Sequence, residues 1–81
     1  MRLDKYLKVS RLVKRRTVAN ELCDAAHVDV NGKTARASYD VKVGDVISIQ
    51  TGAHQTKARV LSVQEYATKE NAESMYELIN N

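Results

Sequence analysis

The residues of this sequence that could do chemistry are concentrated in its first sixteen positions, and most of them are cations. Seven bases and one acid give this segment a net charge of +6, whereas residues 17–64 are neutral and residues 65–81 carry −3. The seven bases are Arg2, Lys5, Lys8, Arg11, Lys14, Arg15 and Arg16. Most runs of charge are solvated helix faces, but this density favours binding to a polyanion, with nucleic-acid phosphates as the expected partner.

Two further residues near these bases have two explanations each. Asp4 lies four residues before Lys8, so an intrahelical ion pair is the first explanation, and a role in aiming basic side chains is the other. Lys33 follows Asn31-Gly32, a pair typical of the two-residue type I′ turn of a β-hairpin. Turn geometry alone explains the Asn-Gly pair, and the functional alternative makes Lys33 a further phosphate contact.

The remaining groups do not form a pattern suited to catalysis or metal binding. Cys23 and His27 are four residues apart, but a zinc site needs three or four protein ligands, and a cysteine on a helix flank usually packs. The sequence therefore predicts no enzyme, no metal and no cofactor. There are four tyrosines and no Phe or Trp. This scarcity favours structured RNA, read by backbone and shape, over single strands stacked on aromatic rings.

Two short helices are expected to position the cations. Helical spacing of apolar residues predicts a helix over 2–11, with Leu3, Tyr6 and Leu7 on one face and the bases broadly opposite. A second helix is predicted over 18–26, with Thr17 as its N-cap. Its expected apolar stripe consists of Val18, Leu22, Ala25 and Ala26.

After the two helices, apolar and polar residues alternate along the chain, which indicates β-strands. Short strands are predicted over 28–30, 33–36, 46–50 and 57–64, followed by a helix over 69–79 that Thr68 caps. The predicted fold class is α+β, with a helical hairpin packed on a small antiparallel sheet and a C-terminal helix. We expect residues 1–65 to form the binding domain. We expect residues 66–81 to pack on it as a C-terminal helix, and the acidic tail over residues 65–81 to face away from the phosphates.

Length and composition limit the classes of protein. A chain of 81 residues and 9.1 kDa is one small domain, and 43% apolar with 28% charged residues is ordinary globular composition. We see no apolar run long enough for a membrane span and no signal peptide, and one cysteine suits a reducing compartment. We therefore expect a cytoplasmic protein that does not bind membranes and is monomeric.

Four blocks, in this order and spacing, resemble the S4-type RNA-binding domain: RLDKYL at 2–7, RRTVA at 15–19, VDVNGK at 28–33 and VGDVI at 43–47. The resemblance implies an S4-like (alpha-L motif) fold whose RNA surface is the helical hairpin and the adjoining turn. Many relatives have Gly where this chain has Ala26 and Pro where it has Val43. A left-handed C-cap at Ala26 would cost about 1 kcal/mol without Gly.

From MRLDKYLKVSRL at 1–12 to Met75-Tyr76 near the end, the chain also resembles the RqcP family of ribosome quality-control factors. This family is similar to the bacterial heat-shock protein that binds free large ribosomal subunits. The resemblance implies binding to large subunits obstructed by peptidyl-tRNA, with contacts to large-subunit rRNA and to tRNA in the P site. It also implies an RqcH-type factor on the same subunit, which adds alanine to the stalled chain.

The same resemblance carries RNA-contact roles to individual residues. These are Arg2, Lys5, Lys8, Arg11, Arg15 and Arg16, and more weakly Asp4, Thr17 and Lys33.

Two alternative functions remain open. One is an RNA-targeting module for a separate rRNA-modifying enzyme, and the other is a protein–protein adaptor that works through the acidic tail.

Overall fold

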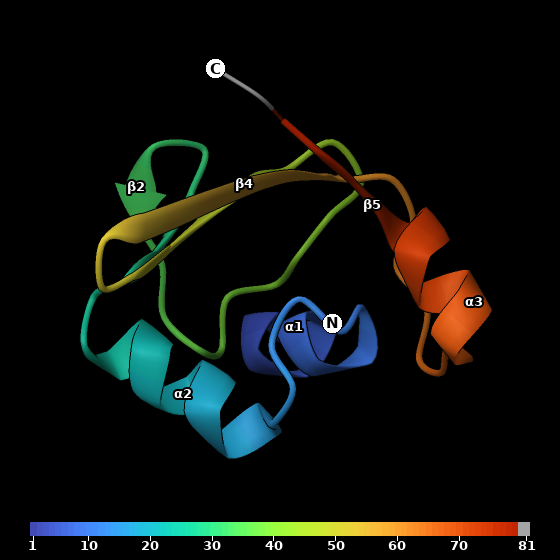
Figure 1. Cartoon of the computed structure of the whole chain (residues 1–81), viewed down its shortest axis with the longest axis horizontal. Coiled ribbons are helices and arrows are strands. Elements are labelled where there is room, and N and C mark those ends of the chain that lie inside the picture. The colour runs from blue at the N-terminus through green and yellow to red at the C-terminus, as the bar shows by residue number, and fades with distance from the viewer. Residues whose placement is uncertain (80–81) are drawn as a thin grey trace.

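The computed structural model describes residues 1–79, which form a helical layer packed against one face of an antiparallel sheet (Figure 1). The strand order is β2-β1-β3-β4-β5. The elements are α1 (Leu3–Val9), α2 (Arg16–Asp24), β1 (Val28–Val30), β2 (Lys33–Thr34), β3 (Val46–Thr51), β4 (His54–Val60), α3 (Lys69–Ala72), the 3₁₀ helix η1 (Glu73–Met75) and β5 (Tyr76–Leu78). The α+β class and the helical hairpin on a small antiparallel sheet are confirmed. Among residues 1–79, no helix has the length and apolar character to cross a membrane.

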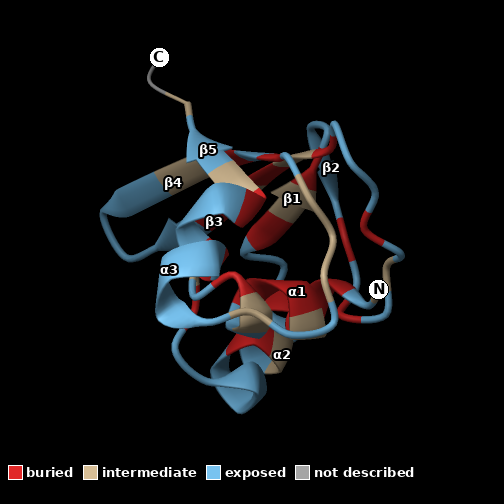
Figure 2. Cartoon of the chain, turned by 90° about the vertical axis from the view of Figure 1, so that its right-hand side faces the viewer, coloured by how far each residue is buried: buried red, intermediate tan, exposed pale blue. Residues whose placement is uncertain are grey.

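The core lies between α1 and the sheet, where Figure 2 shows the buried residues gathered. Leu3, Tyr6 and Leu7 have no exposed surface, as their helical spacing predicted. Alternate strand residues such as Val28 and Ile47 meet them from the sheet. Because one face of α1 is fully buried, its remaining side chains point to solvent or toward α2.

The second helix differs in phase from its prediction. It begins at Arg16, its N-cap residue Arg15 makes no side-chain cap, and Thr17 lies inside the first turn, so the predicted Thr17 cap is wrong. Ala19 and Cys23 are its buried residues, while Val18 is 39% exposed. Both buried residues are small, which allows α2 to approach α1 closely, and the buried stripe lies one residue away from the predicted stripe.

The end of α2 has the left-handed geometry that usually takes glycine. Ala26 has φ 62°, its N–H donates to the carbonyl of Cys23, and the N–H of His27 donates to the carbonyl of Leu22. These two bonds are those of a Schellman motif, in which a residue without a Cβ is favoured. The chain therefore carries a strained alanine at this helix end.

The predicted hairpin turn is confirmed, because Asn31 and Gly32 both have positive φ, 54° and 83°. The return strand β2 is shorter than predicted and stops after Thr34. Ala35, which follows it, is buried in the core. The chain then runs as a loop along the start of α1.

The predicted helix over 69–79 is wrong beyond Ala72. After one helical turn, which Thr68 caps as predicted, the chain tightens into η1 and continues as β5, a fifth strand paired with β4. The carbonyl of Met75 accepts hydrogen bonds from the Tyr6 hydroxyl and from the backbone N–H groups of Leu61 and Ser62. Backbone pairing along the open edge of β4 outweighs the weak tendency of so short a segment to stay helical. Residues 80 and 81, at the end of the predicted 66–81 segment, lie outside the described residues.

Candidate nucleic-acid interface

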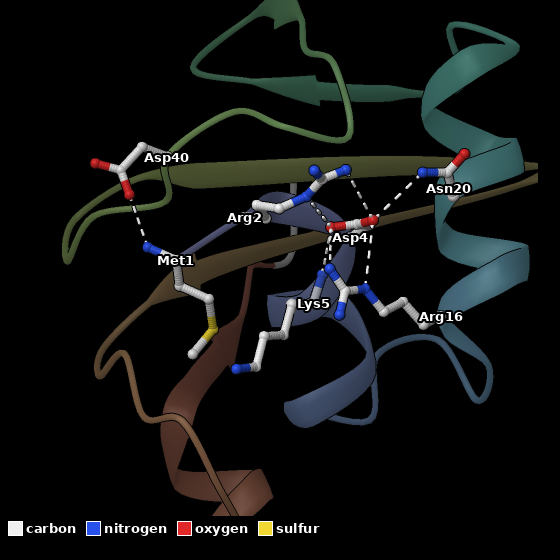
Figure 3. Close-up of polar contacts among 7 residues, drawn as sticks. All are labelled: Met1, Arg2, Asp4, Lys5, Arg16, Asn20 and Asp40. Carbon is white, nitrogen blue, oxygen red and sulfur yellow. Dashed lines mark hydrogen bonds and ion pairs between the residues drawn. The ribbon is translucent and has the colours of Figure 1, made fainter.

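The start of α1 is held by the loop that follows β2. The N–H of Leu3 donates to the carbonyl of Tyr39, and the N–H of Asp4 donates to the carbonyl of Ala37, at 2.8 and 3.2 Å. These bonds satisfy two donors that a helix N-terminus otherwise leaves free. The terminal amine of Met1 also donates to Asp40 (Figure 3). The backbone of the first turn of α1 is therefore tied to this loop.

Asp4 is the centre of the site, and its carboxylate joins the two helices (Figure 3). Its side chain is only 4% exposed. One carboxylate oxygen lies 3.2 Å from Nε of Arg2 and accepts from the Lys5 backbone N–H at 2.8 Å. The other lies 3.4 Å from Nε of Arg16 and accepts from the amide of Asn20 at 3.3 Å. Arg2 and Arg16, fourteen residues apart, are thus held by one buried acid.

This arrangement decides between the two explanations for Asp4. The structure pairs the carboxylate with Arg2 and Arg16, so the expected intrahelical pair with Lys8 is wrong. Asp4 instead orients basic side chains, which was the second of the two explanations. The side chains of Arg2 and Arg16 are 52% and 48% exposed, so each arginine is paired with Asp4 and still accessible to a ligand.

The charge of Asp4 is stabilised in the folded chain. Burial by itself raises the pKa of this carboxyl, but hydrogen bonds from Arg2, Asn20, Arg16 and the Lys5 amide outweigh burial and hold the pKa below its usual range. The acid is therefore ionised at neutral pH, and it orients the arginines as a charge and as an acceptor.

Lys5 and the acidic segment meet, contrary to prediction. The ammonium group of Lys5 pairs with Glu65, whose pKa it lowers by hydrogen bonding and by its charge. The expectation that the acidic residues all face away from the basic surface is therefore wrong for Glu65. At the sheet, Glu77 pairs with Arg59 in the adjacent strand.

The other predicted cations of the helical hairpin are exposed in the last turn of α1 and on the connection between the helices. Lys8 and Arg11 lie at the end of α1, and Lys14 and Arg15 lead into α2. Arg11 has φ 64°, a left-handed conformation that ends α1 and turns the chain. Thr17 is also exposed and borders a hollow together with Asp4 and Arg16.

Lys33 is exposed in β2 and lies apart from the helical cations. The hollow beside it is lined by residues such as Val30, Asn31 and Tyr39. In both overall views β2 lies on the upper side of the molecule and α1 and α2 on the lower side. The structure therefore brings Arg2, Asp4 and Arg16 together, and it leaves Lys33 at a separate place.

Sequence reasoning missed Asn20, whose side-chain amide donates to Asp4. Asn20 carries no charge, and its only signal is its position four residues after Arg16 on the same helix face.

Cys23 packs in the core. Mainly through burial, the pKa of its thiol rises to about 11, so the thiol stays protonated at neutral pH. Within residues 1–79, no three His, Cys, Asp or Glu side chains come together as metal ligands.

Comparison with known proteins agrees with this architecture. The S4 domain family model matches residues 1–47. A curated relative from Streptococcus pneumoniae, called RQC P-site tRNA stabilizing factor, is 49% identical over 99% of this chain and 91% of its own length.

Two solved structures share the fold. The heat shock protein 15 of Vibrio cholerae, described as trimeric, has a TM-score of 0.89 at 25% identity, covering 98% of this chain and 81% of its own. The solution structure of the hypothetical protein HP1423 has a TM-score of 0.84 at 30% identity, covering 100% and 99%. The chain therefore belongs to the S4 domain family and, within it, to the family of the P-site tRNA stabilizing factors.

Proposed function

We propose that this protein is a non-enzymatic RNA-binding factor of ribosome quality control. It binds large ribosomal subunits obstructed by peptidyl-tRNA, contacts large-subunit rRNA and holds the tRNA in the P site. An RqcH-type factor on the same subunit adds alanine to the stalled chain while the tRNA is held. The protein acts as a monomer in the cytoplasm. The name of the Streptococcus pneumoniae relative supports the P-site tRNA as a ligand.

The observation that carries the proposal is the arginine pair fixed by Asp4. A guanidinium group recognises phosphate through a planar fork of donors, and affinity rises when the fork is oriented before binding. Arg2 comes from the start of α1 and Arg16 from the start of α2, so one buried acid sets the spacing of two phosphate-binding groups. Lys8, Arg11, Lys14 and Arg15 extend the positive surface, while Lys5, Thr17 and Lys33 are weaker candidate contacts.

The proposed mechanism uses no catalytic group of this chain. A preformed helical hairpin docks between two RNA backbones, and the ribosome supplies the chemistry. Five to seven phosphate contacts would give a log–log salt slope on the order of −4 to −6, by analogy with duplex DNA.

Sedimentation of the tagged protein with purified large subunits tests the proposal. Wild type is expected to travel with subunits that carry peptidyl-tRNA and less with empty subunits. Arg16→Ala is expected to weaken this association. Arg59→Ala removes an equal charge outside the basic surface of the helical hairpin, and it is expected to leave the association nearly unchanged. Equal binding to both kinds of subunit would contradict tRNA holding. Partners that survive nuclease digestion would favour the adaptor instead.

A further inference from the structure

A groove beside the end of α1 is not accounted for by the arginine pair. One wall comes from the helical hairpin and the other from the segment between β4 and α3, and the groove has a volume of about 510 Å³. It is lined by Lys8, Val9, Arg11, Lys14, Glu65, Tyr66 and Ala67. Segments distant in the sequence thus form one mixed polar and apolar surface.

Tyr66 is the unusual residue of this groove. Tyr66 is 89% exposed, whereas Tyr6 is fully buried in the core. A tyrosine with so much free surface contributes little to folding by burial. Its ring therefore offers a flat apolar face to a ligand.

Three cations line the groove together with Tyr66, and no acidic side chain pairs with them among residues 1–79. Lys8, Arg11 and Lys14 are exposed, and none of them forms an ion pair among the described residues. The one carboxylate of the lining, Glu65, is already paired with Lys5. Arg11 has φ 64°, a left-handed conformation that favours glycine, and the residue at this position is nevertheless a cation. The groove is therefore net positive around an exposed aromatic face.

We propose that this groove holds one unstacked nucleotide of the bound RNA. The Tyr66 ring stacks on the base, and Lys8, Arg11 and Lys14 surround the adjoining phosphates. Aromatic rings beside cations are how proteins hold unpaired bases, since every base has a flat face and every linkage a charge. An acidic peptide would use the cations but not the ring. The inference rests on the proposed RNA-binding function and adds a base contact to it.

Equilibrium binding to two probes tests this inference. One probe is a short single-stranded oligoribonucleotide of mixed sequence, and the other has the same backbone without bases. Tyr66→Leu removes the aromatic ring but keeps apolar bulk. It is expected to weaken binding of the first probe about five- to tenfold at an unchanged salt slope, and to leave the second unaffected. Tyr66→Phe keeps the ring and should bind as wild type.

Lys14→Ala provides the contrasting pattern. It removes a phosphate contact, so it is expected to weaken both probes and to make the salt slope shallower by about 0.7. Val43→Ala trims another exposed apolar side chain, 66% exposed and outside the groove lining, and should change neither probe. Thermal unfolding of each variant shows that the chain still folds.

Several outcomes would overturn the inference. Wild-type affinity of Tyr66→Leu for the oligoribonucleotide is one, and equal weakening on the probe without bases is another. If Arg16→Ala loses binding to large subunits while Tyr66→Leu behaves as wild type on every RNA, the stacking inference fails and the proposed function stands. If wild type shows no salt-dependent binding to RNA at all, both fail together.

Discussion

The substitution Asp4→Asn separates two accounts of how the basic surface binds RNA. It removes a negative charge and raises the net charge of the first sixteen residues from +6 to +7. If binding depended only on summed charge, the variant would bind RNA more tightly. If binding depends on the arginine geometry, the variant binds more weakly, because an amide holds guanidinium groups less well than a carboxylate does.

The expected magnitude follows from the two arginines that Asp4 holds. Released from the carboxylate, Arg2 and Arg16 must each be ordered again when RNA binds, at about 0.5–1.5 kcal/mol per side chain. The two together cost about 1–3 kcal/mol, and the extra positive charge offsets part of this, so the net loss is up to about 2 kcal/mol, or up to about thirtyfold in Kd. The free energy of unfolding should also fall by about 1–2 kcal/mol. The fall is limited because both arginines are about half exposed.

Sedimentation or fluorescence anisotropy with purified large subunits measures the difference, at a temperature where both proteins are folded. Asp24→Asn is the matched control, since Asp24 is exposed at the end of α2 and makes none of the Asp4 contacts. The control makes the same charge change and should bind as wild type or slightly more tightly. Tighter binding by Asp4→Asn, with the fold intact, would refute the positioning role.

Three further predictions concern stability. Ala26→Gly should raise the free energy of unfolding by about 0.5–1 kcal/mol, because relief of a left-handed alanine exceeds the extra chain entropy of glycine; a higher urea midpoint with an unchanged m-value would show it. Tyr6→Phe should lower that free energy by about 1 kcal/mol, since it deletes the buried hydrogen bond to the Met75 carbonyl; an unchanged midpoint would remove this bond from the account. Lastly, buried Asp4 and Asp45 both have pKa values below the usual range, because their hydrogen bonds outweigh burial. The stability that these two carboxylates give the folded chain is complete above the unfolded aspartate pKa of about 3.9, and it is lost as the pH falls through their lower folded pKa values. The melting temperature should therefore fall in acid, and it should fall less for Asp4→Asn than for wild type.

The sequence predicted the first half of the fold well, for physical reasons. Helical spacing in α1 is unambiguous because Leu3, Tyr6 and Leu7 are all large and all buried. In α2 the apolar residues are mostly small, so the amphipathic pattern is weak and the buried face was assigned one residue away. Asn31-Gly32 needs a local conformation that few other pairs adopt, and for this reason the turn was predictable.

The end of the chain was less predictable, because its structure depends on a distant partner. Ala72 and Met75 fit a helical stripe and are both buried. However, the residues after Met75 pair with the open edge of β4, and no local pattern encodes that edge. The site shows the same division. Charge density locates the basic surface in the sequence, but the role of Asp4 depends on the contact of α1 with α2.

The salt dependence of binding tests the central claim most directly. Affinity for large subunits that carry peptidyl-tRNA would be measured over a range of salt concentrations for wild type, Arg16→Ala and Arg59→Ala. We predict a steep wild-type slope, made shallower by about one for Arg16→Ala and unchanged for Arg59→Ala. Equal slopes for Arg16→Ala and wild type would show that Arg16, which Asp4 anchors, does not bind an RNA phosphate.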